Sequence, residues 1–213
     1  MNRARVLLAD DHRMVAEGLK SILNVEFDLL GVVEDGLAML EAAKKLRPDV
    51  IVADITMPRL NGLDALAQLK KENPRAKVVF LTMHQEAAYA RRALDAGASG
   101  FVLKHSAPAE LVAAIRAALE GKTYLTPAIA GEVVQQIRRD PQAGKDPVGL
   151  LTVRQREILQ LVAEGRSAKE IAATFSISAR TVEFHKYQMM ETLGLHNSAE
   201  LVHFAIKHGI VAI

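Results

Sequence analysis

Short apolar runs alternate with segments of helical periodicity along the first 120 residues of the chain. The apolar runs cover residues 6–9, 27–33, 50–53, 78–81 and 101–103. They are rich in Val, Leu and Ile, which is typical of strands buried on both faces. Between them, helices are predicted over residues 12–23, 36–46, 62–72, 85–96 and 108–119. This alternation indicates βαβ units and predicts a parallel sheet flanked by helices.

The pattern changes after residue 123. Residues 124–139 predict one further helix, with Pro127 at its first position. Residues 138–149 are charged and rich in Pro and Gly, so we place a linker there. Beyond the linker, only short helices are predicted.

Two of these helices begin with capping-box patterns at Thr152 and Ser167. A tight turn at residues 176–178 leads into a helix over residues 179–193, and a fourth helix covers residues 198–208. This succession predicts a helix-turn-helix unit. We therefore divide the chain into an α/β domain (1–123), a linker helix with a flexible linker (124–149) and an all-α domain (150–213).

Composition narrows the class of protein. The absence of cysteine excludes disulfides, thiolate catalysis and zinc sites built on cysteine. No run of about 18 apolar residues and no signal-peptide core is found, so we expect a soluble, cytoplasmic protein without membrane contact. The net charge of +2 is too small to indicate nucleic acid by itself.

Polar residues follow four of the predicted strands where each strand ends. They are Asp10 and Asp11, Asp54, Thr82 and Lys104. In an open α/β sheet these carboxyl ends meet at one edge. Clustered carboxylates need a cation, and Mg²⁺ prefers hard oxygen ligands, so we expect Mg²⁺ at Asp11 and Asp54. Lys104 and Thr82 can contact phosphoryl oxygens, which leaves the Asp54 carboxylate as a nucleophile able to form an acyl phosphate.

This arrangement resembles the receiver domain of two-component response regulators. Residues 151–157 and 179–185 resemble the output domain of the NarL/LuxR (FixJ-type) family. The resemblance implies a flavodoxin-like doubly wound (βα)5 receiver with strand order 2-1-3-4-5, followed by a small all-α helix-turn-helix domain. It implies a DNA-binding transcriptional regulator, not an enzyme. A sensor histidine kinase would phosphorylate Asp54, and the phosphorylation would control dimerisation and promoter binding.

The resemblance also implies roles for single residues of the pocket. Asp11, Asp54 and the backbone carbonyl of Thr56 would bind Mg²⁺, with Asp10 acting through water. No other cofactor is implied.

A switch pair is implied as well. The Thr82 hydroxyl would move toward the phosphoryl group, and the ring of Phe101 would turn inward to fill the space. Phe101 lacks the hydroxyl that some members of the family carry there. His105 follows Lys104 where many receivers have proline, and a cis bond before a non-proline residue costs about 2.5–4 kcal/mol. The isomer of that peptide bond is therefore left open.

The helix over residues 179–193 is expected to lie in a major groove of double-stranded DNA. Glu183 could accept a hydrogen bond from a cytosine amine, and Phe184 could pack on a thymine methyl. From the family pattern, the expected base contacts are Glu183, Phe184 and Tyr187, and the expected phosphate contacts are Arg180, Thr181 and Lys186. Because such proteins usually bind paired half-sites, we expect a homodimer in the active form, paired through residues 198–208. RNA polymerase is a candidate partner at the promoter.

Two alternatives stay open. A Mg²⁺-dependent phosphatase with an aspartate nucleophile would need a second Asp two residues after the first, whereas Asp10 and Asp11 are adjacent and followed by His12. A regulator that acts without phosphate is disfavoured by the complete set of acidic residues. His84, two residues after Thr82, could lie at the mouth of the pocket, but we expect it to be a solvent-exposed loop histidine.

Overall fold

The N-terminal domain is built on a parallel sheet of strand order β2-β1-β3-β4-β5-β6. The computed structural model describes residues 3–106, 108–139 and 147–211. Strands β3, β4 and β5 are buried at every position, as expected for runs of Val, Ile and Leu covered on both faces. The strands are β1 (Arg5–Ala9), β2 (Asp28–Val33), β3 (Val50–Ala53), β4 (Val78–Thr82), β5 (Gly100–Leu103) and β6 (Tyr124–Leu125).

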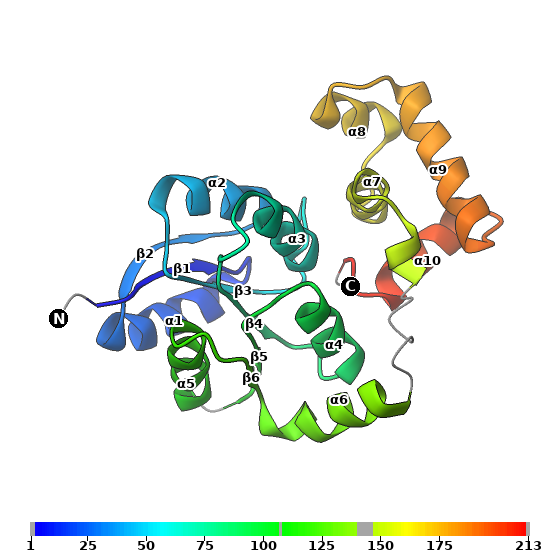
Figure 1. Ribbon diagram of the computed structural model, residues 1–213. Helices are drawn as coiled ribbons and strands as arrows, with labels where there is room; N and C mark the ends of the chain where they lie inside the picture. The colour runs from blue at the N-terminus through cyan, green and yellow to red at the C-terminus, as the bar shows by residue number, and fades with distance from the viewer. Residues whose placement is uncertain (1–2, 107, 140–146, 212–213) are drawn as a thin grey trace.

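Helices cover both faces of this sheet and enclose two apolar cores (Figure 1). One core lies under α2, α3 and α4, and the other lies under α1 and α5. The sheet is therefore doubly wound, as predicted. The helices are α1 (Arg13–Glu26), α2 (Gly36–Leu46), α3 (Gly62–Glu72), α4 (Ala87–Asp95) and α5 (Pro108–Leu119).

The predicted helix over residues 124–139 is wrong in its first turn. Tyr124 and Leu125 form β6, which pairs in parallel with β5, and α6 covers only Pro127–Arg139. The Tyr124 amide donates to the Ser99 carbonyl. Without β6, strand β5 would present a row of unpaired backbone groups at the edge of the sheet. The sheet therefore has one strand more than the five expected, and α6 packs Ile129 and Val133 into the core beside α4.

The C-terminal domain has its own apolar core. The predicted capping boxes at Thr152 and Ser167 are both formed, and Gly194 ends α9 in the left-handed conformation. Val148 already packs in this core, while residues 140–146 of the expected flexible linker lie outside the described residues. The elements are a 3₁₀ turn (Pro147–Leu150), α7 (Val153–Ala163), α8 (Ala168–Phe175), α9 (Ala179–Leu193) and α10 (Ser198–Lys207).

Within the described part of the chain, no helix combines the length and the apolar character that crossing a bilayer requires.

Candidate functional site

The strand-end residues predicted from the sequence meet at one edge of the sheet. Asp10 and Asp11 follow β1, Asp54 follows β3, Thr82 ends β4 and Lys104 follows β5. These four strands are neighbours in the sheet, so their carboxyl ends lie side by side. Asp10, Asp54 and Thr82 are all buried, with at most 4% of each residue exposed. The sheet thus assembles the acidic pocket that the sequence predicts.

Lys104 joins two carboxylates of this pocket. Its ammonium nitrogen lies 2.8 Å from Asp10 Oδ2 and 2.6 Å from Asp54 Oδ2. Burial raises the pKa of the Asp54 carboxyl, and Lys104 opposes that shift. Burial lowers the pKa of Lys104, but the attraction of Asp54 and Asp10 outweighs it and leaves that pKa raised. One cation is therefore shared by two buried carboxylates, and the site as a whole keeps an excess of negative charge.

The loop after Asp54 holds one oxygen of its carboxylate. Asp54 Oδ1 accepts hydrogen bonds from the Ile55 amide at 2.6 Å and, more weakly, from the Thr56 amide at 3.4 Å. The other oxygen, Oδ2, faces Lys104. Gly62, at the start of α3, lies so close that a Cβ there would fall 2.2 Å from the Asp54 carbonyl oxygen. The glycine is needed because α3 begins directly against the phosphoacceptor candidate.

The donor set of the pocket suits a divalent cation. Asp10, Asp11, His12 and Asp54 each offer a ligand atom, and these atoms lie within 4.8 Å of one another. Asp11 Oδ1 is buried without a hydrogen bond, although His12 Nδ1 lies 3.0 Å away as an ion-pair partner. A buried carboxylate oxygen in that state is costly unless a cation joins it. Carboxylate oxygens at this density are the ligands that Mg²⁺ prefers.

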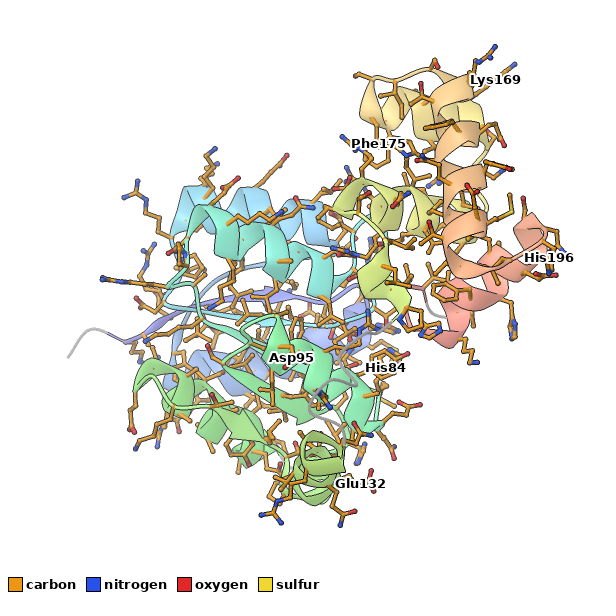
Figure 2. All side chains as sticks on the ribbon, turned by 45° about the vertical axis from the view of Figure 1, so that its right-hand side comes forward. His84, Asp95, Glu132, Lys169, Phe175 and His196 are labelled. Carbon is orange, nitrogen blue, oxygen red and sulfur yellow. The ribbon has the colours of Figure 1, made fainter. Side chains whose placement is uncertain are left out.

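His84 lies in a loop, as expected, but the expectation that it is solvent-exposed is wrong. His84 is half-buried on the side of the receiver that faces the C-terminal domain (Figure 2). Its Nε2 lies 2.7 Å from Thr56 Oγ1, its ring stacks on Tyr89 at 4.1 Å, and its amide donates to Thr82 Oγ1 at 3.3 Å. Burial lowers the pKa of this imidazole. The partners come from the loop after β3, from β4 and from α4, so no local pattern in the sequence could have revealed the contact.

Phe101 is fully buried in the core under α4. It pairs with Phe80 on one side and with Leu125 of β6 on the other. The aromatic ring of the expected switch pair is thus already directed inward, because β6 and α6 close the edge where it would otherwise be exposed. The peptide bond between Lys104 and His105 is trans.

Helix α9 presents exposed aromatic side chains on the surface of the C-terminal domain. Phe184 is 56% exposed and Tyr187 is 63% exposed, whereas Val182 and Met189 are buried. Glu183 accepts two hydrogen bonds from Lys186, both at 3.1 Å. The residues expected to contact DNA differ in their exposure. Four are exposed, namely Arg180, Glu183, Phe184 and Tyr187, and two are half-buried, namely Thr181 and Lys186.

Two protein families match the chain, each over one domain. Residues 6–116 match the response regulator receiver domain, and residues 149–205 match the luxR family of bacterial regulatory proteins. The transcriptional regulatory protein MctR of Rhizobium johnstonii is 39% identical over 99% of this chain and 96% of its own length. The oxygen regulatory protein NreC of Staphylococcus epidermidis is 35% identical over 95% of this chain and 97% of its own length.

Solved structures of response regulators are similar to this chain over most of its length. RcsB of Salmonella typhimurium superposes with a TM-score of 0.64 at 29% identity, over 96% of this chain and 97% of that one. RcsB of Salmonella enterica serovar Typhimurium, bound to promoter P1flhDC in the presence of the phosphomimetic BeF3-, gives a TM-score of 0.63 at 28% identity. That match covers 95% of this chain and 98% of the other.

Proposed function

The chain belongs to the response regulators of the NarL/LuxR family, and from that premise we propose that phosphoryl transfer to Asp54 switches its activity. It is a DNA-binding transcriptional response regulator. The observation that carries the proposal is the position of Lys104, whose ammonium group touches the carboxylates of both Asp10 and Asp54. A buried cation at that point can pass from a carboxylate oxygen to an incoming phosphoryl oxygen.

In the proposed reaction, Asp54 Oδ2 attacks the phosphorus of a phosphohistidine on a sensor histidine kinase. A P–O bond to Asp54 forms as the P–N bond to the histidine breaks, and the electron pair of that bond returns to the imidazole. The Ile55 amide holds Oδ1 throughout, which orients Oδ2 for attack. Lys104 stabilises the negative charge that builds on the phosphoryl oxygens.

Mg²⁺ is the proposed cofactor of this pocket. Asp11, Asp54 and the carbonyl of Thr56 would hold it, with Asp10 acting through water. The bound ion would supply Lewis-acid polarisation of a phosphoryl oxygen. Oδ1 of Asp11, which is buried and accepts no hydrogen bond, supports this assignment.

We propose Thr82 and Phe101 as the switch pair. The Thr82 side chain is fully buried beside the pocket, and its hydroxyl accepts from the His84 amide. A phosphoryl group on Asp54 offers that hydroxyl a stronger, charged acceptor. The buried ring of Phe101 then packs behind the hydroxyl as it moves.

The proposed target is double-stranded promoter DNA, bound by a homodimer at paired half-sites. RcsB is a relative solved as dimers bound to DNA, which supports this assembly. Glu183, Phe184 and Tyr187 are proposed to meet base edges, and Arg180, Thr181 and Lys186 to meet phosphates. Because the proposed target is promoter DNA, we also propose that the protein acts in the cytoplasm, with RNA polymerase as a further partner.

Transcriptional regulators of this kind are not an enzyme class, and we propose no turnover of a substrate. We keep the two-domain division at residues 1–123 and 150–213. The separate apolar cores support two domains, although β6 packs with the receiver and Val148 with the C-terminal core from just outside these bounds.

The test is intact-mass detection of a phosphoryl adduct after incubation with acetyl phosphate and Mg²⁺. The parent protein should gain one phosphoryl group, and Asp54→Asn should gain none, because the amide cannot act as the nucleophile. Asp28→Asn is the matched control, since Asp28 is exposed at the start of β2, and it should behave like the parent. An adduct on Asp54→Asn equal to that of the parent would contradict the assignment.

A further inference from the structure

The last residue before α6 bonds to the end of strand β5. Thr126 lies between β6 and α6 and is almost fully buried, with 2% of the residue exposed. Its amide donates to the Phe101 carbonyl at 3.0 Å, and its Oγ1 accepts from the Leu103 amide at 3.2 Å. Phe101 and Leu103 are themselves buried. One residue outside the acidic pocket therefore holds two backbone groups of the strand that leads to Lys104.

The Thr126 hydroxyl takes the place of a backbone carbonyl. The parallel pairing of β6 with β5 ends at Leu125, and Pro127 then begins α6. In a continued parallel strand the Thr126 carbonyl would be the next acceptor for β5, but it accepts from the Ile129 amide in the first turn of α6 at 3.1 Å. The Leu103 amide would then be a buried donor without an acceptor, which costs free energy. Thr126 Oγ1 supplies that acceptor at the point where the strand turns into a helix.

The backbone of Lys104 is anchored through the same segment. Its amide donates to the Thr82 carbonyl at 2.8 Å, and the residue before it, Leu103, is held by Thr126. The end of β5 is thus fixed by β4 on one side and by Thr126 on the other. From there the Lys104 side chain, 5% exposed, extends to within 2.6 Å of Asp54 Oδ2. Because groups that act on a reacting centre must keep their place within about 0.5 Å, the position of this strand end matters for the contact.

The two hydrogen bonds of Thr126 act on different residues of the site. The amide holds Phe101, the aromatic residue of the proposed switch pair, and this bond does not depend on the side chain. The hydroxyl holds Leu103 and, through it, Lys104. A substitution that removes only the hydroxyl therefore affects the lysine and leaves the backbone bond to Phe101 in place.

We propose that Thr126 is a positioning residue of the phosphorylation site, whose hydroxyl fixes the end of β5 and so places the Lys104 ammonium group for the phosphoryl oxygens. The inference rests on the proposed function and adds a residue to it. Thr126 lies beyond residues 6–116, the part of the chain that matches the receiver domain. It belongs to the junction of β6 and α6, at the edge of the sheet (Figure 1). That junction is therefore part of the phosphorylation site, although it contributes no group to the pocket itself.

The first measurement is the initial rate of adduct formation with acetyl phosphate and Mg²⁺ in the full chain. Thr126→Val keeps the shape of the side chain and removes the acceptor, so the end of β5 loses its fixed position. We expect the rate to fall about tenfold, because a small displacement of a group that acts on the transferred phosphoryl has a large effect on rate. Thr126→Ser restores the hydroxyl and should return the rate to that of the parent.

The second measurement is fluorine NMR of the protein with BeF3-, the phosphomimetic used with RcsB. On Asp54 this group would present fluorine atoms where the phosphoryl oxygens stand, with Lys104 against one of them. We expect the fluorine resonances of the bound group to shift or broaden in Thr126→Val and to match those of the parent in Thr126→Ser. A role confined to stability would leave the resonances of the folded protein unchanged.

Lys77→Met is the matched control for stability. Lys77 Nζ donates to the Leu119 carbonyl at 2.8 Å, beside the amino end of β4. This substitution also removes a bond from a side chain to the backbone, but at the edge of the sheet opposite to the pocket. We expect it to lower the free energy of unfolding, measured by urea denaturation, while the rate and the fluorine resonances stay those of the parent.

The outcomes separate this inference from the proposed function. If Thr126→Val keeps the rate and the fluorine resonances of the parent, or if Lys77→Met changes them equally, the positioning role is overturned and phosphorylation of Asp54 stands. If the parent forms no adduct, both are overturned. Should Thr126→Val fail to fold, Thr126→Ala decides the question by the same two measurements, because a water in the vacated space can satisfy the Leu103 amide without fixing it.

Discussion

Burial in the folded domain gives single residues of the pocket properties that they would not have in water or in a short isolated peptide. Burial raises the pKa of Asp54, yet a nucleophilic carboxylate must be ionised, and Lys104 supplies the charge that makes ionisation possible. Asp11 keeps a buried oxygen without a hydrogen bond. Such groups lower the free energy of unfolding, and they are typical of sites where a ligand binds.

The half-buried imidazole of His84 predicts a pH dependence of stability. Burial lowers the pKa of His84 below its usual value of 6.5 in the folded state. Between these two values the unfolded chain binds more protons, so the free energy of unfolding falls as the pH drops below about 6.5. In His84→Gln, which takes up no proton there, that fall should be shallower. Urea denaturation at pH steps from about 7 to 5 measures the difference.

The control for this prediction is His203→Gln, at an exposed position of α10. It should retain the pH dependence of the parent. Identical pH dependence in the parent and in His84→Gln would show that the imidazole of His84 does not govern stability in this range.

Single helices of the C-terminal domain begin at local sequence signals, and one of them, α9, also has an exposed face. Helices α7 and α8 begin at the capping boxes of Thr152 and Ser167, which a short stretch of sequence specifies completely. Helix α9 buries Val182 and Met189 on one side and leaves Phe184 and Tyr187 open on the other. Exposed aromatic side chains on one helix face indicate a surface that binds a partner.

Two substitutions in α9 should weaken DNA binding in different ways. Arg180→Ala should weaken binding to operator and unrelated DNA alike and lower the salt slope by about 1, because one phosphate contact is lost. Phe184→Ala should instead cost about 1–2 kcal/mol of discrimination between operator and mismatched DNA. Titrations at several salt concentrations distinguish the two effects.

Lys44→Ala serves as the control for Arg180→Ala. It removes the same charge from an exposed position on α2, far from α9, and should leave binding unchanged. If Phe184→Ala lowers affinity for all sequences equally, Phe184 does not read a base.

At the scale of the whole molecule, the two domains meet through a small number of close contacts. Gln160 of α7 donates to the Met57 carbonyl of the receiver, and Arg92 of α4 donates to the His208 carbonyl at the end of α10. Gly209, directly after His208, has a left-handed φ of 60°, and a Cβ there would fall 2.2 Å from the Tyr89 hydroxyl oxygen. The close approach of the domains depends on the missing side chain.

Gly209→Ala should therefore loosen the contact between the two domains. Gly194→Ala is the matched control, because Gly194 has a φ of 66° but open space around it. Both substitutions place alanine in the left-handed region at a cost of about 1–2 kcal/mol, and only Gly209→Ala adds a clash between domains. We attach spin labels at Glu72→Cys and Lys169→Cys, two exposed positions in the two domains of a chain without cysteine. We expect the distribution of distances between the labels to broaden with Gly209→Ala alone. Equal broadening in both variants would assign the effect to backbone strain.

The sequence by itself determined the alternation of strands and helices, the helix caps and the polar residues at the strand ends. These features follow from local rules: apolar periodicity, cap chemistry and the common edge of parallel strands. The core elements of the receiver and the members of the acidic pocket could be named for that reason. Resemblance to a known family extended the prediction to DNA and to a kinase.

Only the tertiary structure decided which distant groups meet. Strand β6 is two residues long and forms because β5 needs a partner at its edge. His84 lies 28 residues from Thr56, and Gln160 lies 103 residues from Met57. Contacts of that separation depend on how loops and domains pack, and a side chain amide carries no sign of its partner. The fold could therefore be predicted from periodicity, whereas the connection between the two domains could not.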